Sequence, residues 1–241
     1  MRRAVCIFLL SLLLPWAVEA QYVNTYVAAG TVTSQIEGDE LKGFKHWGFA
    51  GGVGAIFRFD AEGTWALSAE AAYSNRGVYN NMHTFDNLYN IRLNLRYVDI
   101  PLTLHFKDPI GGIRFGIGPV YSRLVQQPHD TIAFNPDHFM PDTSDLTFLR
   151  NDLSLAAELR FTVWENLQLS VRYQHSLIPI KKGWKFTENG NTWENDCYNQ
   201  SVTLRLLWQF GEQDKPSRHK ASTRRNSRQY QKPKVNVRRR R

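Results

Sequence analysis

The sequence contains little cysteine and no long apolar run beyond its first residues. Only two of its 241 residues are cysteines, Cys6 and Cys197, and this excludes a fold held together by a disulfide framework. No stretch of about 18 apolar residues follows the N-terminal segment, which excludes a bundle of membrane-spanning helices. Aromatic residues make up 13% of the chain, a content that excludes disorder over most of its length.

The formal net charge of +8 is distributed unevenly along the chain. Residues 212–241 contain 12 Lys and Arg against two acids, whereas residues 21–211 contain 16 Lys and Arg against 19 Asp and Glu. The basic character therefore belongs to a tail. Because this tail has very few apolar residues, we expect residues 212–241 to be disordered.

Residues 1–20 have the pattern of a secretory signal peptide. Arg2 and Arg3 precede an apolar stretch over residues 4–14, and residues 18–20 (Val-Glu-Ala) resemble a cleavage site. An N-terminal membrane anchor is the alternative, although the apolar stretch is short for a span. We expect the mature protein to begin at Gln21 and to retain Cys197 as its single cysteine.

Alternation of apolar and polar residues dominates residues 21–211 and predicts eight long β-strands. The clearest case is 201–210, in which Val202, Leu204 and Leu206 share one face while Thr203 and Arg205 share the other. The eight predicted strands cover residues 22–34, 46–59, 65–76, 89–106, 111–125, 152–163, 167–176 and 201–210.

The predicted connections alternate between short and long. Short turns are expected at 60–63, 107–110 and 164–166, and long loops at 35–45, 77–88, 126–151 and 179–197. Strands of about 10–14 residues exceed the 5–6 typical of soluble sheets and suit a tilted transmembrane strand. The sequence therefore predicts an all-β fold, an eight-stranded antiparallel up-and-down transmembrane β-barrel spanning residues 21–211.

One strand register follows from the sequence. Pairing Val163 with Leu167 across a three-residue turn aligns the apolar faces of 152–163 and 167–176. This register also places Glu158 opposite Arg172, a favourable cross-strand pair. A slip of one residue would turn every Leu of the second strand to the other face.

The polar face of the predicted strands carries charges of both signs among small residues, which suits the filled lumen of a narrow barrel. Aromatic residues lie on the apolar face, mostly near strand ends, as in membrane-interface girdles. A soluble lipocalin-like barrel with the apolar face inside is the alternative. The predicted lumen network consists of Glu70, Arg92, Arg96, Arg114, Glu158, Arg160, Arg172 and Arg205, with Glu158–Arg172 and Glu70–Arg96 as structural pairs.

The apolar phase of residues 89–106 changes partway along. Ile91, Leu93 and Leu95 alternate in one phase, whereas Val98 and Ile100 begin the opposite phase. Such a shift is typical of a β-bulge, and Pro101 nearby is consistent with one. The sequence therefore predicts a bulge within this strand.

Residues 97–102 read Tyr-Val-Asp-Ile-Pro-Leu, followed by a glycine-rich strand at 112–119 and a last strand that ends Trp-Gln-Phe at Phe210. This pattern resembles the PorT-like outer-membrane β-barrel family of Bacteroidota, whose signature would include Tyr97, Asp99 and Pro101. The resemblance covers about residues 21–211 and implies a barrel. Some members of that family work in type IX secretion. The basic tail departs from the many relatives that end at the last strand.

Catalytic and metal-binding patterns are weak in this sequence. His175 and Ser176 are adjacent in a strand, and their side chains therefore point to opposite faces. Loop 126–151 contains two His and four Asp, but without the spacing of a metal site. We therefore expect no enzyme activity, no cofactor and no metal, and we expect Cys197 to be unreactive.

The sequence thus predicts a small, non-catalytic outer-membrane barrel of a Gram-negative bacterium with both termini in the periplasm. Its expected partners are outer-membrane lipid and, through the tail, a cell-wall polymer or periplasmic protein. Nucleic acid is not an expected partner behind a signal peptide. A barrel subunit of a secretion or envelope-assembly machine is the alternative function. The tail residues expected to make contacts are Arg224, Arg225, Arg238, Arg239, Arg240 and Arg241.

Overall fold

The computed structural model describes residues 23–39, 43–60, 63–84, 87–108, 112–128, 132–133, 139–141, 146–188 and 190–211. The expected signal peptide and the expected disordered tail lie outside these residues. Within the described part of the chain, no helix is long and apolar enough to cross a membrane.

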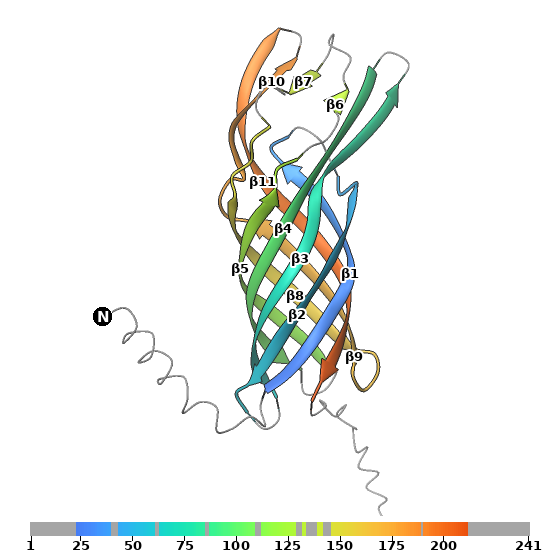
Figure 1. Ribbon diagram of the computed structural model, residues 1–241, viewed down its shortest axis with the longest axis vertical. Coiled ribbons are helices and arrows are strands. Elements are labelled where there is room, and N and C mark those ends of the chain that lie inside the picture. The colour runs from blue at the N-terminus through green and yellow to red at the C-terminus, as the bar shows by residue number, and fades with distance from the viewer. Residues whose placement is uncertain are drawn as a thin grey trace, which may run out of the picture.

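Eight antiparallel strands form a closed barrel, which confirms the predicted fold class (Figure 1). Each strand pairs with its neighbour in order, and pairing of the first strand with the last closes the sheet. The barrel strands are β1 (Val23–Glu37), β2 (His46–Arg58), β3 (Trp65–Thr84), β4 (Asn87–Lys107), β5 (Ile113–Gln126), β8 (Asn151–Thr162), β9 (Leu167–Ser176) and β11 (Asn191–Phe210).

Three further strands lie at the loop end, the end of the barrel opposite the short turns (Figure 1). β10 (Lys181–Glu188) pairs with the upper part of β11, β7 (Phe139–Pro141) pairs with β10, and β6 (Ile132–Ala133) pairs with β4. β1 begins and β11 ends at the opposite, turn end.

The apolar face of the sheet points outward and the polar face points into the barrel. On β8, Leu155 is 43% exposed whereas Glu158 is 2% exposed, and inward and outward positions alternate along the strand. The alternative of a soluble barrel with an apolar interior is therefore wrong. An apolar exterior is the surface that a transmembrane barrel presents to lipid.

The predicted register of β8 and β9 is confirmed. Glu158 faces Arg172, Leu159 faces Val171, and Phe161 faces Leu169. The turn is closed by a hydrogen bond of 2.9 Å from the Val163 amide to the Leu167 carbonyl. A three-residue turn and two aligned apolar faces were sufficient to fix this pairing.

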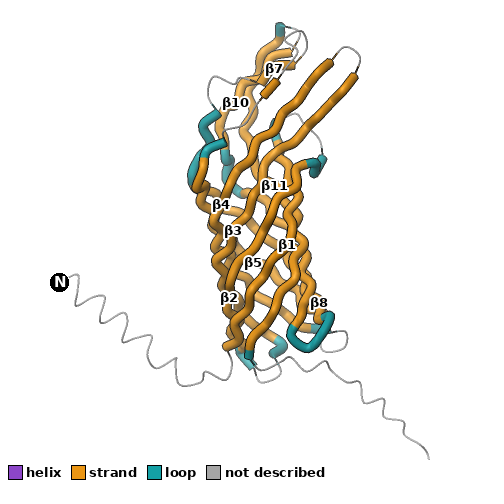
Figure 2. The backbone as a smooth tube through the Cα atoms, turned by 45° about the vertical axis from the view of Figure 1, so that its right-hand side comes forward, coloured by secondary structure: helices purple, strands orange, loops and turns teal. Residues whose placement is uncertain are grey.

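Two segments expected to be long loops are instead β-hairpins that rise beyond the barrel (Figure 2). β3 and β4 remain paired as far as Thr84 and Asn87, and β10 and β11 as far as Glu188 and Asn191. We call these two hairpins the arms. Backbone hydrogen bonds hold their ladders without the strict alternation of apolar residues by which the barrel strands were recognised.

Gly77 shows why glycine does not break β3. A β-carbon at this position would lie 1.8 Å from the carbonyl oxygen of Leu93 on β4. The Ser34 hydroxyl of β1 donates to the Gly77 carbonyl and also accepts from its amide, at 3.0 and 2.8 Å. The glycine therefore permits a close approach within a continuous strand.

The bulge predicted within residues 89–106 is wrong. β4 alternates without interruption, and Leu93, Leu95 and Tyr97 all point inward. Its register with β3 is the same from Trp65–Phe106 to Thr84–Asn87. The register shift lies between β4 and β5, where the extra residue is Val125 of β5. The apolar phase changes because the barrel interior itself becomes apolar near the loop end.

Candidate functional site in the barrel interior

A network of charged side chains fills the middle of the barrel. Arg172 of β9 donates from Nη2 to Glu70 Oε2 and to Glu158 Oε2, both at 3.0 Å. Arg160 donates to both carboxylate oxygens of Glu158 at 3.0 and 3.1 Å. Arg205 of β11 bonds to Glu70 and lies 3.3 Å from Glu158 Oε1. We call these five residues the central ion network.

The central ion network crosses the lumen. Glu70 lies on β3, which has no sheet neighbour among β8, β9 and β11, so its bonds to Arg172 and Arg205 join opposite walls. Every side chain of the network is at most 5% exposed. Two carboxylates against three guanidinium groups leave one excess positive charge, and the Tyr26 hydroxyl adds a hydrogen bond of 2.9 Å to Glu70.

A second polar layer lies between the central ion network and the loop end. Arg76 forms an ion pair with Asp99, which also accepts a hydrogen bond of 2.7 Å from the Ser74 hydroxyl. The guanidinium carbon of Arg76 lies 5.2 Å from the ring centroid of Tyr97. Asn199 Nδ2 donates to the Tyr97 hydroxyl at 3.0 Å. This layer joins β3, β4 and β11 across the interior.

An apolar cluster, which we call the apolar plug, fills the interior above this second layer. Phe148 and Trp184 meet edge to face with ring centroids 6.0 Å apart, and Trp184 and Phe186 lie 5.1 Å apart. Lys181 Nζ lies 5.6 Å from the Phe148 ring and 5.8 Å from the Trp184 ring. The buried members of the plug are Ile36, Val78, Leu93, Leu95, Tyr97, Leu124, Phe148, Ile180, Trp184, Phe186 and Cys197.

Most residues of the apolar plug come from segments that the sequence assigned to loops. Phe148 comes from the segment before β8, whereas Trp184 and Phe186 come from the inward face of β10. Their alternation with exposed Lys185 is a strand pattern, but three positions are too few to distinguish it from a loop. Cys197 is fully buried in the plug.

The structure brings together five of the eight residues predicted for the lumen network, namely Glu70, Glu158, Arg160, Arg172 and Arg205. Arg114 is also buried and faces Arg160 across the β5–β8 ladder. Sequence reasoning missed Tyr26 and the Arg76–Asp99 pair. Each of these residues occupies an inward position in the alternation of its strand (β1, β3 or β4), and this position was the signal in the sequence that could have identified it.

The placement of Arg92 and Arg96 in the lumen is wrong. Both side chains are exposed on the outer face of β4, because the even-numbered positions of this strand point outward. The predicted pair of Glu70 with Arg96 is therefore wrong as well. Glu70 is paired with Arg172 and Arg205 instead.

The three residues of the resemblance motif all face the interior. Tyr97 and Asp99 are buried at the boundary between the apolar plug and the second polar layer, and Pro101 is buried next on the same face. Tyr97 thus contacts apolar side chains with its ring and Asn199 with its hydroxyl.

His175 and Ser176 point to opposite faces, as their adjacency in a strand requires. The Ser176 hydroxyl donates to Asp152 Oδ2 inside the barrel at 2.9 Å. His175 lies outside, 3.9 Å from Glu37 Oε2 and stacked on Tyr198. These two residues therefore cannot act as a nucleophile and its base.

The remaining site predictions fall on parts of the chain without a described structure. The His and Asp side chains of loop 126–151 and the six tail arginines lie outside the described residues. Within the described part, no group of three or more His, Cys, Asp or Glu is placed to hold a metal ion.

The sequence model of the family described as "Outer membrane protein beta-barrel domain" matches residues 4–210. No curated protein matches the chain. Among solved structures, the attachment invasion locus protein Ail of Yersinia pestis is 13% identical with a TM-score of 0.42, and covers 78% of this chain and 98% of its own. OprG of Pseudomonas aeruginosa is 13% identical with a TM-score of 0.41, over 80% of this chain and 98% of its own. Neisserial surface protein A is 12% identical with a TM-score of 0.40, over 77% of this chain and 97% of its own.

Proposed function

Because the chain belongs to the outer membrane protein β-barrel domain family, we propose that it is a non-catalytic barrel with a sealed interior, whose arms stand outside the cell. The observation that carries this proposal is the filling of the interior at successive levels. The central ion network joins opposite walls at mid-barrel, and the apolar plug lies above it. An eight-stranded barrel leaves room for little more than its own side chains.

The interior favours a structural role over a catalytic one. Each carboxylate of the central ion network is bound by at least two guanidinium groups, which suits mechanical bracing better than proton transfer to a substrate. The described contacts of the outward His175 are with Glu37 and Tyr198, and neither a Ser nor a Thr hydroxyl is among them. The two arms rise beyond the barrel and are accessible to a protein partner (Figure 2).

The proposed orientation places the arms at the cell surface and both termini in the periplasm, the usual arrangement of short periplasmic turns and longer outer loops. It is tested by thiol labelling of intact cells in a Cys197→Ala background. A membrane-impermeant maleimide is expected to label Thr192→Cys at the tip of an arm. Glu165→Cys, in the short turn between β8 and β9, is expected to react only after the outer membrane is permeabilised. The reverse pattern would overturn the orientation.

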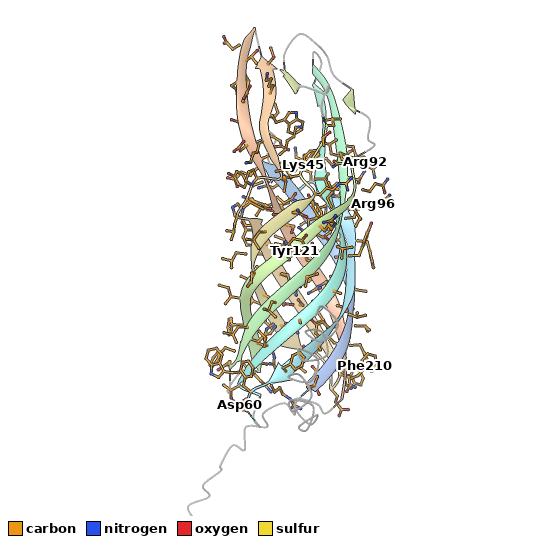
Figure 3. All side chains as sticks on the ribbon, turned by 60° about the vertical axis from the view of Figure 1, so that its left-hand side comes forward. Lys45, Asp60, Arg92, Arg96, Tyr121 and Phe210 are labelled. Atoms are coloured by element: carbon orange, nitrogen blue, oxygen red, sulfur yellow. The ribbon has the colours of Figure 1, made fainter. Side chains whose placement is uncertain are left out.

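We also propose that the basic tail tethers the barrel to an anionic cell-wall polymer, headgroup or protein in the periplasm. The net charge of +10 over residues 212–241 supports this role, as does the position of Phe210, the last residue of β11, at the turn end (Figure 3). The alternative function, a subunit of an envelope machine of the PorT-like type, rests on Tyr97, Asp99 and Pro101.

One experiment separates the tether from the machine. The barrel is crosslinked and affinity-purified from native envelope, both as the full chain and truncated after Gly211. A tether predicts cell-wall material that is lost on truncation. A machine subunit predicts a fixed set of membrane proteins that survives truncation. Equal recovery of cell-wall material with both chains would exclude a tether to the cell wall.

A further inference from the structure

A group of arginines points outward on one side of the barrel near the loop end. Arg92 and Arg96 on β4 and Arg123 on β5 are exposed, as is Arg150 just before β8. Arg123 pairs with Val98 in the ladder, two residues along β4 from Arg96. Figure 3 shows Arg92 and Arg96 at this level, well above Asp60 and Phe210 at the turn end. We call these four residues the arginine patch.

Arg96 and Arg123 of the arginine patch bind neutral amide oxygens and not carboxylates. Arg96 Nη1 donates to Gln126 Oε1 at 2.7 Å, and Arg123 Nη1 donates to Asn151 Oδ1 at 3.3 Å. The same Asn151 oxygen accepts a hydrogen bond of 2.9 Å from the Tyr121 hydroxyl. Among the described outward positions of β4, β5 and β8 there is no Asp or Glu. The amides therefore orient the guanidinium groups without neutralising their charge.

The arginine patch lies where the apolar surface ends. Below it, the outward residues of β4 from Val98 to Phe106 are all apolar, and Ile100 is 52% exposed. Val98 and Phe106 are eight residues apart. At ~3.4 Å per residue and a strand tilt of about 40°, they differ in height along the barrel axis by about 21 Å, close to the ~25 Å apolar band of such barrels. Outward side chains just beyond this band are level with lipid headgroups. Tyr121 faces Ile100 in the ladder and lies at the upper margin of the band, where interface aromatics are common.

A hollow in the apolar surface lies below the arginine patch on the same side of the barrel. Its volume is about 300 Å³, and Ile117 and Ala157, which face each other across the β5–β8 ladder, form part of it. Ile117 is six residues along β5 from Arg123. The short side chain of Ala157 leaves the depression that its larger neighbours surround. The hollow is lined by Ile117, Leu155, Ala157, Tyr173, His175 and Leu177.

We propose that this surface binds a phosphorylated lipid, with the phosphate on Arg96 and Arg123 and one acyl chain in the hollow. Under the proposed orientation, on which this inference rests, the lipid is the phosphorylated lipid A of the outer leaflet. Arginine presents several donors in a planar fork that matches phosphate oxygens. The basic patch at the level of the headgroups and the hollow at the level of the acyl chains lie on the same side of the barrel. This arrangement favours one amphipathic ligand over a free anion.

The test uses the full chain in nanodiscs of phosphatidylcholine that contain a minor fraction of lipid A, with retained lipid measured by native mass spectrometry. Arg96→Gln combined with Arg123→Gln is expected to weaken retention of lipid A by at least about tenfold, because two charge-assisted hydrogen bonds are lost. Lys182→Gln combined with Lys185→Gln removes the same charge from an arm and should retain lipid A like the unchanged protein. Ala157→Phe, which fills the hollow, is expected to weaken retention without altering the patch.

Three results would overturn the proposal. The first is retention of lipid A by the Arg96/Arg123 variant equal to that of the unchanged protein. The second is retention of dephosphorylated lipid A equal to that of phosphorylated lipid A. The third is displacement of lipid A by millimolar inorganic phosphate alone. Folding of every variant is checked by heat-dependent gel mobility. In nanodiscs, the purified barrel contacts lipid at both of its ends, so the retention of lipid A does not depend on the orientation in the cell. Loss of the lipid proposal would therefore leave the orientation measured by thiol labelling unchanged.

Discussion

Glu158 contacts more guanidinium groups than Glu70, the other carboxylate of the central ion network. Its side chain is fully buried and contacts three guanidinium groups, those of Arg160, Arg172 and Arg205. Charges taken out of water are tolerated only when they are paired. Loss of this carboxylate would leave three arginines to share Glu70 inside the barrel.

We therefore expect Glu158→Gln to lower the free energy of unfolding by roughly 3–5 kcal/mol, the range for breaking a buried ion pair. The measurement is a denaturant titration of the barrel in lipid vesicles. The matched control is Glu37→Gln, because the Glu37 side chain is 56% exposed and its removal should change stability by less than about 1 kcal/mol. Equal effects of the two substitutions would show that the central ion network does not brace the barrel.

For individual residues, the sequence predicted the side-chain pair that follows from a tight turn and missed the pairs that depend on the shape of the barrel interior. The Glu158–Arg172 pair follows from period-2 alternation and the three-residue turn. Arg92 and Arg96 were misplaced because their apolar neighbours Leu93 and Leu95 were assumed to face lipid. Those leucines face the apolar plug, and a single strand cannot reveal that the interior changes from polar to apolar along the barrel.

At the scale of elements, the arms are extensions of barrel strands whose bases are anchored inside the barrel. β10 places Trp184 and Phe186 in the apolar plug, where Phe148 packs against Trp184. The sequence predicted the eight barrel strands because each alternates over ten residues or more. It assigned residues 77–88 and 179–197 to loops because apolar and polar residues do not alternate strictly there.

We expect Phe186→Ala to loosen the β10 arm while the barrel below stays folded. The substitution opens a cavity in the plug, and local opening follows where few other apolar contacts hold the hairpin. Limited trypsin digestion of the barrel in vesicles should then cut faster at Lys182 and Lys185, with unchanged heat-dependent gel mobility. Thr187→Ala, a neighbouring position on the same strand, is the control. An unchanged cleavage rate for Phe186→Ala would contradict anchoring of the arm by the plug.

At the scale of the whole molecule, the protein is a barrel with an apolar exterior and an interior occupied by buried side chains at several levels. From the loop end toward the turn end, the apolar plug is followed by the Arg76–Asp99 layer and the central ion network. A smaller apolar cluster around Tyr26 and Leu207 lies within the barrel as well. Under the proposed function, filled layers of this kind close the aqueous path that a porin keeps open.

The proposed sealing of the barrel interior is tested by ion conductance across a planar lipid bilayer. The full chain is refolded, its folding is verified by heat-dependent gel mobility, and its insertion into the same lipid is verified by resistance of the barrel strands to protease. A sealed barrel is expected to give no stepwise current above the bilayer baseline over the usual range of applied voltage. Reproducible stepwise currents from the folded, inserted protein would contradict it.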